Sequence, residues 1–148
     1  MSEAGNGRSL RHVAMDYLAR REHTTAELRQ KLKPKAQDPD EIESVLQQLK
    51  DEKLQSDERF AESFVNQRYR SGVGPIKIRY ELRQKGIEEA LIDTFLEPLD
   101  GEWDELMRAQ RERKFGNAIP GDYSARMKQA RFLQNRGFSP EAVMRLFR

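Results

Sequence analysis

The chain has 148 residues, of which 36% are hydrophobic and 35% charged, and its formal net charge is +2 at pH 7. Because it holds no cysteine, it has no disulfide framework, no thiolate metal site and no cysteine nucleophile. No stretch approaches the roughly 20 apolar residues that span a bilayer, and the small, polar segment Met1–Arg8 lacks the apolar run of a signal peptide. We therefore expect a soluble, cytoplasmic protein without a membrane partner, with small cores rather than one large core.

Charge is distributed unevenly along the chain. Residues 38–62 hold nine acids and three bases, residues 88–105 hold eight acids and no base, and residues 108–136 hold eight bases and two acids. Charge runs of this kind are most often solvated helix faces. The basic runs recur at the same place in each repeat described below, which favours a patterned binding surface.

The first third of the chain predicts three short helices. Residues 9–22 place apolar side chains at helical spacing. Thr24 and Glu27 have the spacing of a capping box that begins a second helix, which Pro34 should end. Asp38, followed by proline, begins a third. The expected buried stripes are Leu10, Val13, Ala14, Tyr17 and Leu18, then Leu28 and Leu32, then Ile42, Val45, Leu46 and Leu49.

The same pattern returns twice. Residues 60–65 repeat the first stripe at an offset of 47, and the five letters of Glu27–Lys31 return at Glu81–Lys85 with an offset of 54. The difference places seven extra residues in the connection around Ser71–Pro75. Residues 132–138 form a weaker third copy of the middle helix. Helix boundaries are expected at Ser56 or Asp57, Gly74-Pro75, Gly86, Pro98, Asp100, Gly137 and Ser139-Pro140, with a loop at 116–122 and a middle helix at 125–136.

These patterns predict an all-α fold of three tandem three-helix repeats that form an elongated, curved molecule. No alternation of apolar and polar residues is long enough to indicate a sheet. We expect a flexible N-terminus over residues 1–8 and repeats over residues 9–55, 56–98 and 99–148.

The sequence offers no catalytic group, metal site or cofactor site, and we expect no enzyme activity. His12 and His23 lack the acids that metal-ligand motifs require, and a hydrogen-bonded or solvated histidine is the better interpretation. Gly72-Val73-Gly74 lacks the strand and the Gly-Lys-Ser/Thr of a phosphate loop, which favours a connection between helices.

The basic middle helices are the candidate binding surface. Arg79 and Arg83 lie four residues apart on one helical face, and we expect them to be the main electrostatic contact. The alternative is that these arginines pair with the acidic third helices and only join helices together. Acids on the third helices disfavour insertion of those helices into a DNA groove. Tyr69 and Tyr80 are candidates for base stacking, with core packing as the alternative. The full candidate set is Arg68, Arg70, Lys77, Arg79, Arg83, Lys85, Arg29, Lys31, Arg131 and Arg136.

Four stretches together resemble the RecX family of bacterial recombinase regulators: Ala19–Leu28, Asp57–Glu62, Arg68–Gly74 and Ile78–Ile87, the last ending in Leu-Arg-Gln-Lys-Gly-Ile. The resemblance implies a protein that binds the RecA–single-stranded-DNA filament and modulates, mostly by inhibition, its ATP hydrolysis and strand exchange. It thereby implies regulation of homologous recombination, DNA repair and the SOS response. It also implies a curved molecule that lies along the filament groove, with no fixed catalytic residues.

Several alternatives stay open at this point. A non-specific, architectural DNA-binding protein would use the same basic strip, on single- or double-stranded DNA, and a scaffold without nucleic-acid contact is a third possibility. We expect a monomer. The sequence does not distinguish capping of the filament, blocked extension and destabilisation as mechanisms of inhibition.

Overall fold

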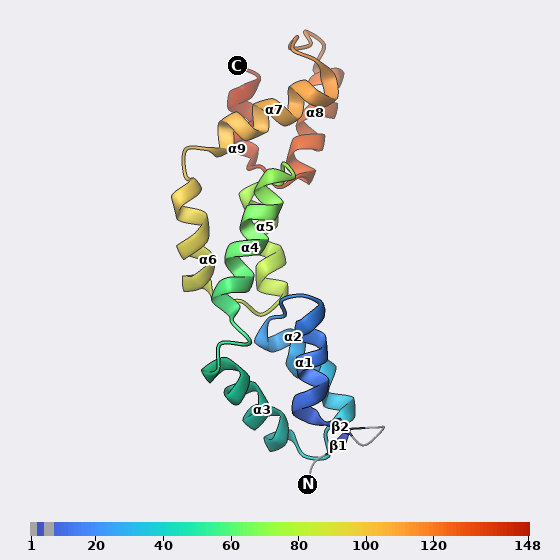
Figure 1. Cartoon of the computed structure of the whole chain (residues 1–148). Helices are drawn as coiled ribbons and strands as arrows, with labels where there is room; N and C mark the ends of the chain where they lie inside the picture. The colour runs from blue at the N-terminus through green and yellow to red at the C-terminus, as the bar shows by residue number, and fades with distance from the viewer. Residues whose placement is uncertain (1–2, 5–7) are drawn as a thin grey trace.

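The computed structural model describes residues 3–4 and 8–148. Within these ranges the chain forms nine α-helices in three successive units, which lie one after another along an extended molecule (Figure 1). Unit 1 holds α1 (Leu10–Arg20), α2 (Thr25–Leu32) and α3 (Pro39–Asp51); unit 2 holds α4 (Asp57–Arg70), α5 (Pro75–Gln84) and α6 (Glu89–Leu96); unit 3 holds α7 (Trp103–Phe115), α8 (Tyr123–Asn135) and α9 (Pro140–Leu146). The expected all-α fold of three tandem three-helix repeats is confirmed.

The N-terminal segment contains one short ladder. Strands β1 (Glu3–Ala4) and β2 (Arg8–Ser9) pair antiparallel, with Glu3 opposite Ser9 and Ala4 opposite Arg8. The expected flexibility of residues 1–8 falls largely on residues 1–2 and 5–7, which lie outside the described part of the chain.

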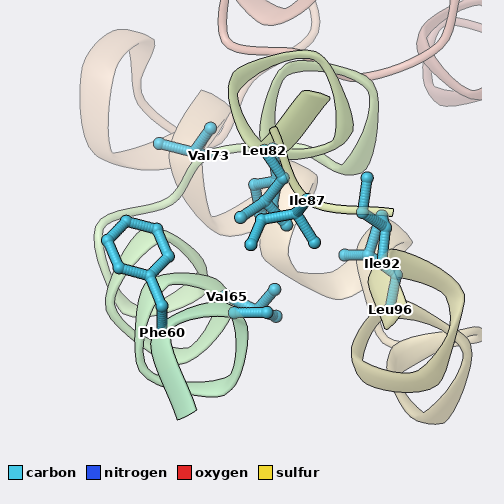
Figure 2. Close-up of a cluster of buried hydrophobic side chains, with 9 residues drawn as sticks. Phe60, Val65, Val73, Leu82, Ile87, Ile92 and Leu96 are labelled. Carbon is cyan, nitrogen blue, oxygen red and sulfur yellow. The ribbon is translucent and has the colours of Figure 1, made fainter. Parts of the chain in front are cut away.

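Each unit buries its own small apolar cluster. Figure 2 shows the cluster of unit 2, to which α4, α5 and α6 all contribute. Ile78, Leu82 and Ile92 are fully buried there. Trp103 packs against the clusters of both unit 2 and unit 3, and Tyr69 meets its ring edge-on at 5.5 Å between centroids. Tyr69 therefore belongs to the packing between units, as the core interpretation of this residue expected.

Local signals in the sequence set most helix ends. Thr24 and Glu27 form the expected capping box, with the Thr24 hydroxyl accepting from the Glu27 N–H at 3.0 Å and the Glu27 carboxylate accepting from the Thr24 N–H. Pro34 lies in a 3₁₀ turn, η1 (Lys33–Lys35), that ends α2. Pro98 does the same after α6 in η2 (Glu97–Leu99). Gly86 has a φ of +82°, which a residue with a side chain adopts only with strain.

Three details differ from the expectations. The connections before α2 and α5 both span four residues, and Leu28 is the fourth residue of α2 whereas Leu82 is the eighth of α5. The extra residues therefore lengthen the helices and not the connection, because Pro75 begins α5 one turn earlier.

Asp100 does not cap the last unit, because its N–H closes η2 on Glu97 and a turn at Gly101 (φ +91°) intervenes before α7. Helix α8 begins at Tyr123 and not at 125, because the Asp122 side chain caps the Ala125 N–H.

The middle helices of successive units stack end to end. At the joint between units 2 and 3, the N–H groups of Gly74 and Ile76 donate to the carbonyls of Arg136 and Gly137 at 2.7 and 3.0 Å. The unpaired amides at the start of α5 thus satisfy the unpaired carbonyls at the end of α8. At the joint between units 1 and 2, the Thr24 hydroxyl donates to the Lys85 carbonyl at 2.7 Å.

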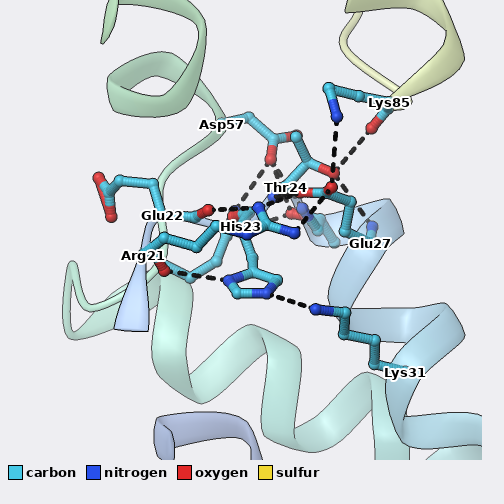
Figure 3. A network of polar contacts seen from close by, with 10 residues as sticks. Arg21, Glu22, His23, Thr24, Glu27, Lys31, Asp57 and Lys85 are labelled. Carbon is cyan, nitrogen blue, oxygen red and sulfur yellow. Dashed lines mark hydrogen bonds and ion pairs between the residues drawn. The ribbon is translucent and has the colours of Figure 1, made fainter. Parts of the chain in front are cut away.

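A polar network surrounds the joint between units 1 and 2 (Figure 3). Thr25 N and the Gln55 amide both donate to Asp57, at 2.8 and 2.9 Å. The ring of His23 lies between the Arg21 carbonyl at 3.0 Å and the Lys31 ammonium at 2.8 Å. Because an ammonium group only donates, the ring nitrogen that faces Lys31 must accept, and His23 is neutral with its proton on Nδ1.

Burial first, and then the charges of Arg21 and Lys31, hold the pKa of His23 below its usual value. Burial by itself would raise the pKa of Glu27, the capping carboxylate in the same network. The hydrogen bonds from Arg21 and the Thr24 N–H outweigh that effect, and the pKa of Glu27 is lowered. The joint is therefore arranged for a neutral imidazole and an ionised carboxylate.

Candidate functional site

The arginines of α5 bind acids within their own unit. Arg79 donates to Glu89 and Asp93, both at 2.8 Å, and Arg83 also donates to Glu89. The hydrogen bond from Arg83 is the main reason that the pKa of Glu89 lies below its usual value. This is the geometry of the alternative in which these arginines join the middle helix to the acidic third helix.

Three more candidates make similar contacts. Arg68 donates two hydrogen bonds to the Glu81 carboxylate, at 3.0 and 2.7 Å, and Arg29 donates two to the Glu43 carboxylate, at 2.7 and 3.1 Å. Arg136 donates to backbone carbonyls at the joint between units 2 and 3, at 3.0 Å to residue 72 and 2.6 Å to residue 71. These guanidinium groups hold together elements of the fold, and a partner would have to compete for them.

The candidate lysines divide between the first joint and the surface. Lys31 bonds to His23, and Lys85 lies 3.6 Å from the Glu27 carboxylate and 5.8 Å from the ring centroids of Phe60 and Phe64. Lys77 is exposed at the start of α5.

Lys77, Arg70 and Arg131 are the candidates whose charges have no partner. All three are exposed, and none makes a hydrogen bond or ion pair with another residue in the part of the chain that the structure describes. The structure therefore divides the ten candidates into two groups. Seven make polar contacts within the fold, and three face solvent without such a contact.

Exposed polar positions repeat on the middle helices of units 2 and 3. Lys77, Tyr80 and Gln84 on α5 correspond to Lys128, Arg131 and Asn135 on α8 at the offset of 51 that aligns Leu82 with Leu133. All six side chains are exposed, and Tyr80 keeps 59% of its surface accessible. We call these six residues the open face. It carries no acid, and Lys128 is the one cation on it that sequence reasoning missed, although the offset pointed to it.

The other polar groups do not gather into a catalytic arrangement. His12 is exposed and lies 3.8 Å from Asp16, while His23 belongs to the first joint. Among the described residues, no three His, Cys, Asp or Glu side chains come together as metal ligands. No helix in those ranges combines the length and the apolar character that crossing a membrane requires.

Each of the three units matches a separate family model. Residues 11–49 match the first three-helix domain of RecX, residues 56–96 the second and residues 101–147 the third. The chain belongs to the RecX family. The resemblance seen in the sequence is thereby confirmed.

Named relatives and solved structures agree with this assignment. Regulatory protein RecX of Halorhodospira halophila is 45% identical over 97% of this chain and 89% of its own length, and that of Pseudomonas fluorescens Pf-5 is 44% identical over 93% and 89%. The crystal structure of RecX from Lactobacillus salivarius covers 90% of this chain and 89% of its own with a TM-score of 0.77 at 24% identity, which supports the fold. A second crystal structure of a regulatory protein RecX gives a TM-score of 0.74 at 28% identity, over 90% of this chain and 70% of its own. A regulatory role follows for this chain.

Proposed function

We propose that this RecX-family chain is a cytoplasmic, monomeric regulator that binds the RecA–single-stranded-DNA filament and inhibits its ATP hydrolysis and strand exchange. Membership of a family of regulatory proteins supports the regulatory role. The extended row of three units suits a helical filament, because contacts to neighbouring protomers add through effective concentration. We also propose that the chain itself hydrolyses neither nucleotide nor nucleic acid.

The observation that carries this proposal is the open face. Lys77 on α5 and Lys128 on α8 are exposed cations at matching positions of two consecutive units, and Arg131 on α8 is a third exposed cation opposite Tyr80 in this alignment; none of the three has an intramolecular partner among the described residues. Solvated cations of this kind contact carboxylates or phosphates without first losing an ion pair. The proposed contact therefore moves from Arg79 and Arg83, which hold carboxylates, to the open face.

Charge reversal on the open face tests this assignment. We expect Lys77→Glu with Arg131→Glu to weaken filament binding by about tenfold or more and to reduce its salt dependence, because two contacts are lost. Lys33→Glu with Lys50→Glu is the matched control, since both lysines are exposed, belong to unit 1 and change the net charge equally. Equal inhibition of the filament by the open-face variant and the control would show that the contact lies elsewhere.

A non-specific DNA-binding protein is the second candidate, and one observation favours it. Tyr80 is exposed and follows Lys77 by three residues on the same helical face, and an exposed tyrosine ring beside a cation is suited to stacking on an unpaired base. Binding to naked single-stranded DNA that equals binding to the RecA-coated filament at matched salt would support this second function over the first.

A further inference from the structure

Helix α7 buries an arginine without a carboxylate partner. Arg111 keeps 2% of its surface accessible, and its bonds go to the carbonyls of Asn117 and Ala118, at 2.9 and 3.2 Å, and to the Gln129 side chain at 3.4 Å. Its Nε is buried and has no hydrogen-bond partner, and no acid of the described residues pairs with the guanidinium. Two of its three partners are thus backbone carbonyls of the connection between α7 and α8.

Burial of this charge is difficult to explain by stability alone. An ion removed from water without an opposite charge destabilises a fold, and apolar groups of similar volume often serve as well or better in its place. The cluster of unit 3 already has fully buried apolar members such as Leu133 and Val143. What Arg111 adds is a fixed conformation for the connection that it holds.

A second arginine holds the same connection from the other side. Arg126, in the first turn of α8, donates from Nε to the Pro120 carbonyl at 2.6 Å. Guanidinium groups from α7 and α8 therefore bind the carbonyls of three of the four residues from 117 to 120. A segment without regular secondary structure, which would otherwise be mobile, is fixed at both sides.

The fixed connection presents apolar side chains to solvent. Ile119 keeps 41% of its surface accessible, and Tyr123, at the start of α8, keeps 75%, the largest value among the exposed large hydrophobic residues. Among the neighbouring residues of the chain, Arg113, Lys114 and Lys128 are exposed bases, Arg126 is half-buried, and the two acids are Glu112 and Asp122, of which Asp122 caps α8. The connection therefore exposes two apolar side chains, and bases outnumber acids among the residues that flank it in the chain.

We propose that residues 116–123, the α7–α8 loop, dock on a protein partner that offers an apolar pocket with an acidic rim. Ile119 and Tyr123 are the anchors, and Arg111 is a positioning residue that holds the loop in its binding conformation before contact. A protein is the favoured partner because an aliphatic side chain such as Ile119 fills a pocket but does not stack on bases. The proposal rests on the proposed function in one respect: the partner is the protein coat of the filament and not its DNA.

Removal of the anchors tests the docking. We expect Ile119→Ser with Tyr123→Ser to bind the RecA-coated filament about tenfold or more weakly while its binding to naked single-stranded DNA stays unchanged. Met144→Ser is the control, because Met144 is 47% exposed on α9 of the same unit and lies outside the loop. Equal losses on coated and naked DNA would assign the loop to nucleic acid, and no loss would remove it from the interface. A parent chain that does not bind the filament would overturn the proposed function and, with it, this docking.

Replacement of Arg111 separates positioning from folding. We expect Arg111→Met to keep or raise the melting temperature, to lower the backbone NMR order parameters of residues 117–119 and 121, and to weaken filament binding. A variant that melts several degrees lower while the order parameters of the loop stay unchanged would show that Arg111 serves the fold, and would contradict the proposal.

Discussion

The joint between units 2 and 3 leaves no room for a side chain at Gly74. A Cβ placed there would lie 2.4 Å from the carbonyl carbon of Gly137, 2.5 Å from its oxygen and 2.7 Å from the Phe138 nitrogen. The backbone of Gly74, with φ −81° and ψ 166°, suits any residue. Gly74→Ala is therefore strained only by the neighbouring unit, and this makes it a specific probe of the end-to-end stacking of α5 and α8.

Because backbone atoms surround the added methyl group, the units must separate to admit it. The variant then loses the bonds from Gly74 and Ile76 to unit 3 and weakens those from Arg136 to unit 2. At about 0.5–1.5 kcal/mol for each of these bonds, we expect a loss of about 2–4 kcal/mol from the free energy of unfolding. The helix content should persist, since each unit keeps its own cluster.

Urea unfolding followed by circular dichroism, together with small-angle scattering, measures both effects. We expect Gly74→Ala to unfold at lower urea concentration and to scatter as a more flexible molecule. Gly121→Ala is the control, because its added Cβ meets nothing within 4 Å and its φ is not positive. Because alanine leaves the unfolded chain fewer conformations than glycine does, the free energy of unfolding of Gly121→Ala should be unchanged or slightly raised. If both variants unfold alike and scatter alike, the joint is not packed as described.

Three further predictions concern the first joint and the core. The pKa of His23 is lower in the folded chain than in the unfolded chain, so the unfolded state binds more protons in acid; the melting temperature should fall as pH drops through about 6.5, and His23→Gln should lack that part of the decline. Thr24→Ala removes a helix cap and the bond to the Lys85 carbonyl, and should lower the free energy of unfolding by about 2–3 kcal/mol in urea titrations. Leu82→Ala should lower it by about 2–5 kcal/mol, whereas Ile76→Ala, at a 52% exposed site, should change it by less than about 0.5 kcal/mol.

The fold could be predicted because its signals are local. A threonine and a glutamate three residues apart, a proline after an acid and a glycine before an apolar residue each act on the backbone next to them. The prediction that Asp100 begins the last unit was wrong because it used the residue type alone. An aspartate suits a helix cap, but the turn at Gly101 separates Asp100 from α7.

Local signals in the sequence did not show which cations form ion pairs within the fold and which face solvent. Whether Arg79 faces solvent or Glu89 depends on how α5 lies against α6, and no spacing within one helix contains that information. The burial of Arg111 did leave a signal, since it follows the buried Met107 by four residues and shares its helical face. Buried helical faces are identified from the spacing of apolar residues, so an arginine at a buried position is not recognised by this criterion.

The most direct test of the central claim is the rate of ATP hydrolysis by RecA on single-stranded DNA, measured as this chain is added. We predict that the rate falls with increasing concentration of the chain, that the chain alone hydrolyses no ATP, and that Lys77→Glu with Arg131→Glu restores most of the rate. A rate that does not change, while the chain binds naked single-stranded DNA as tightly as the filament, would contradict a regulator of the filament and leave a non-specific DNA-binding protein.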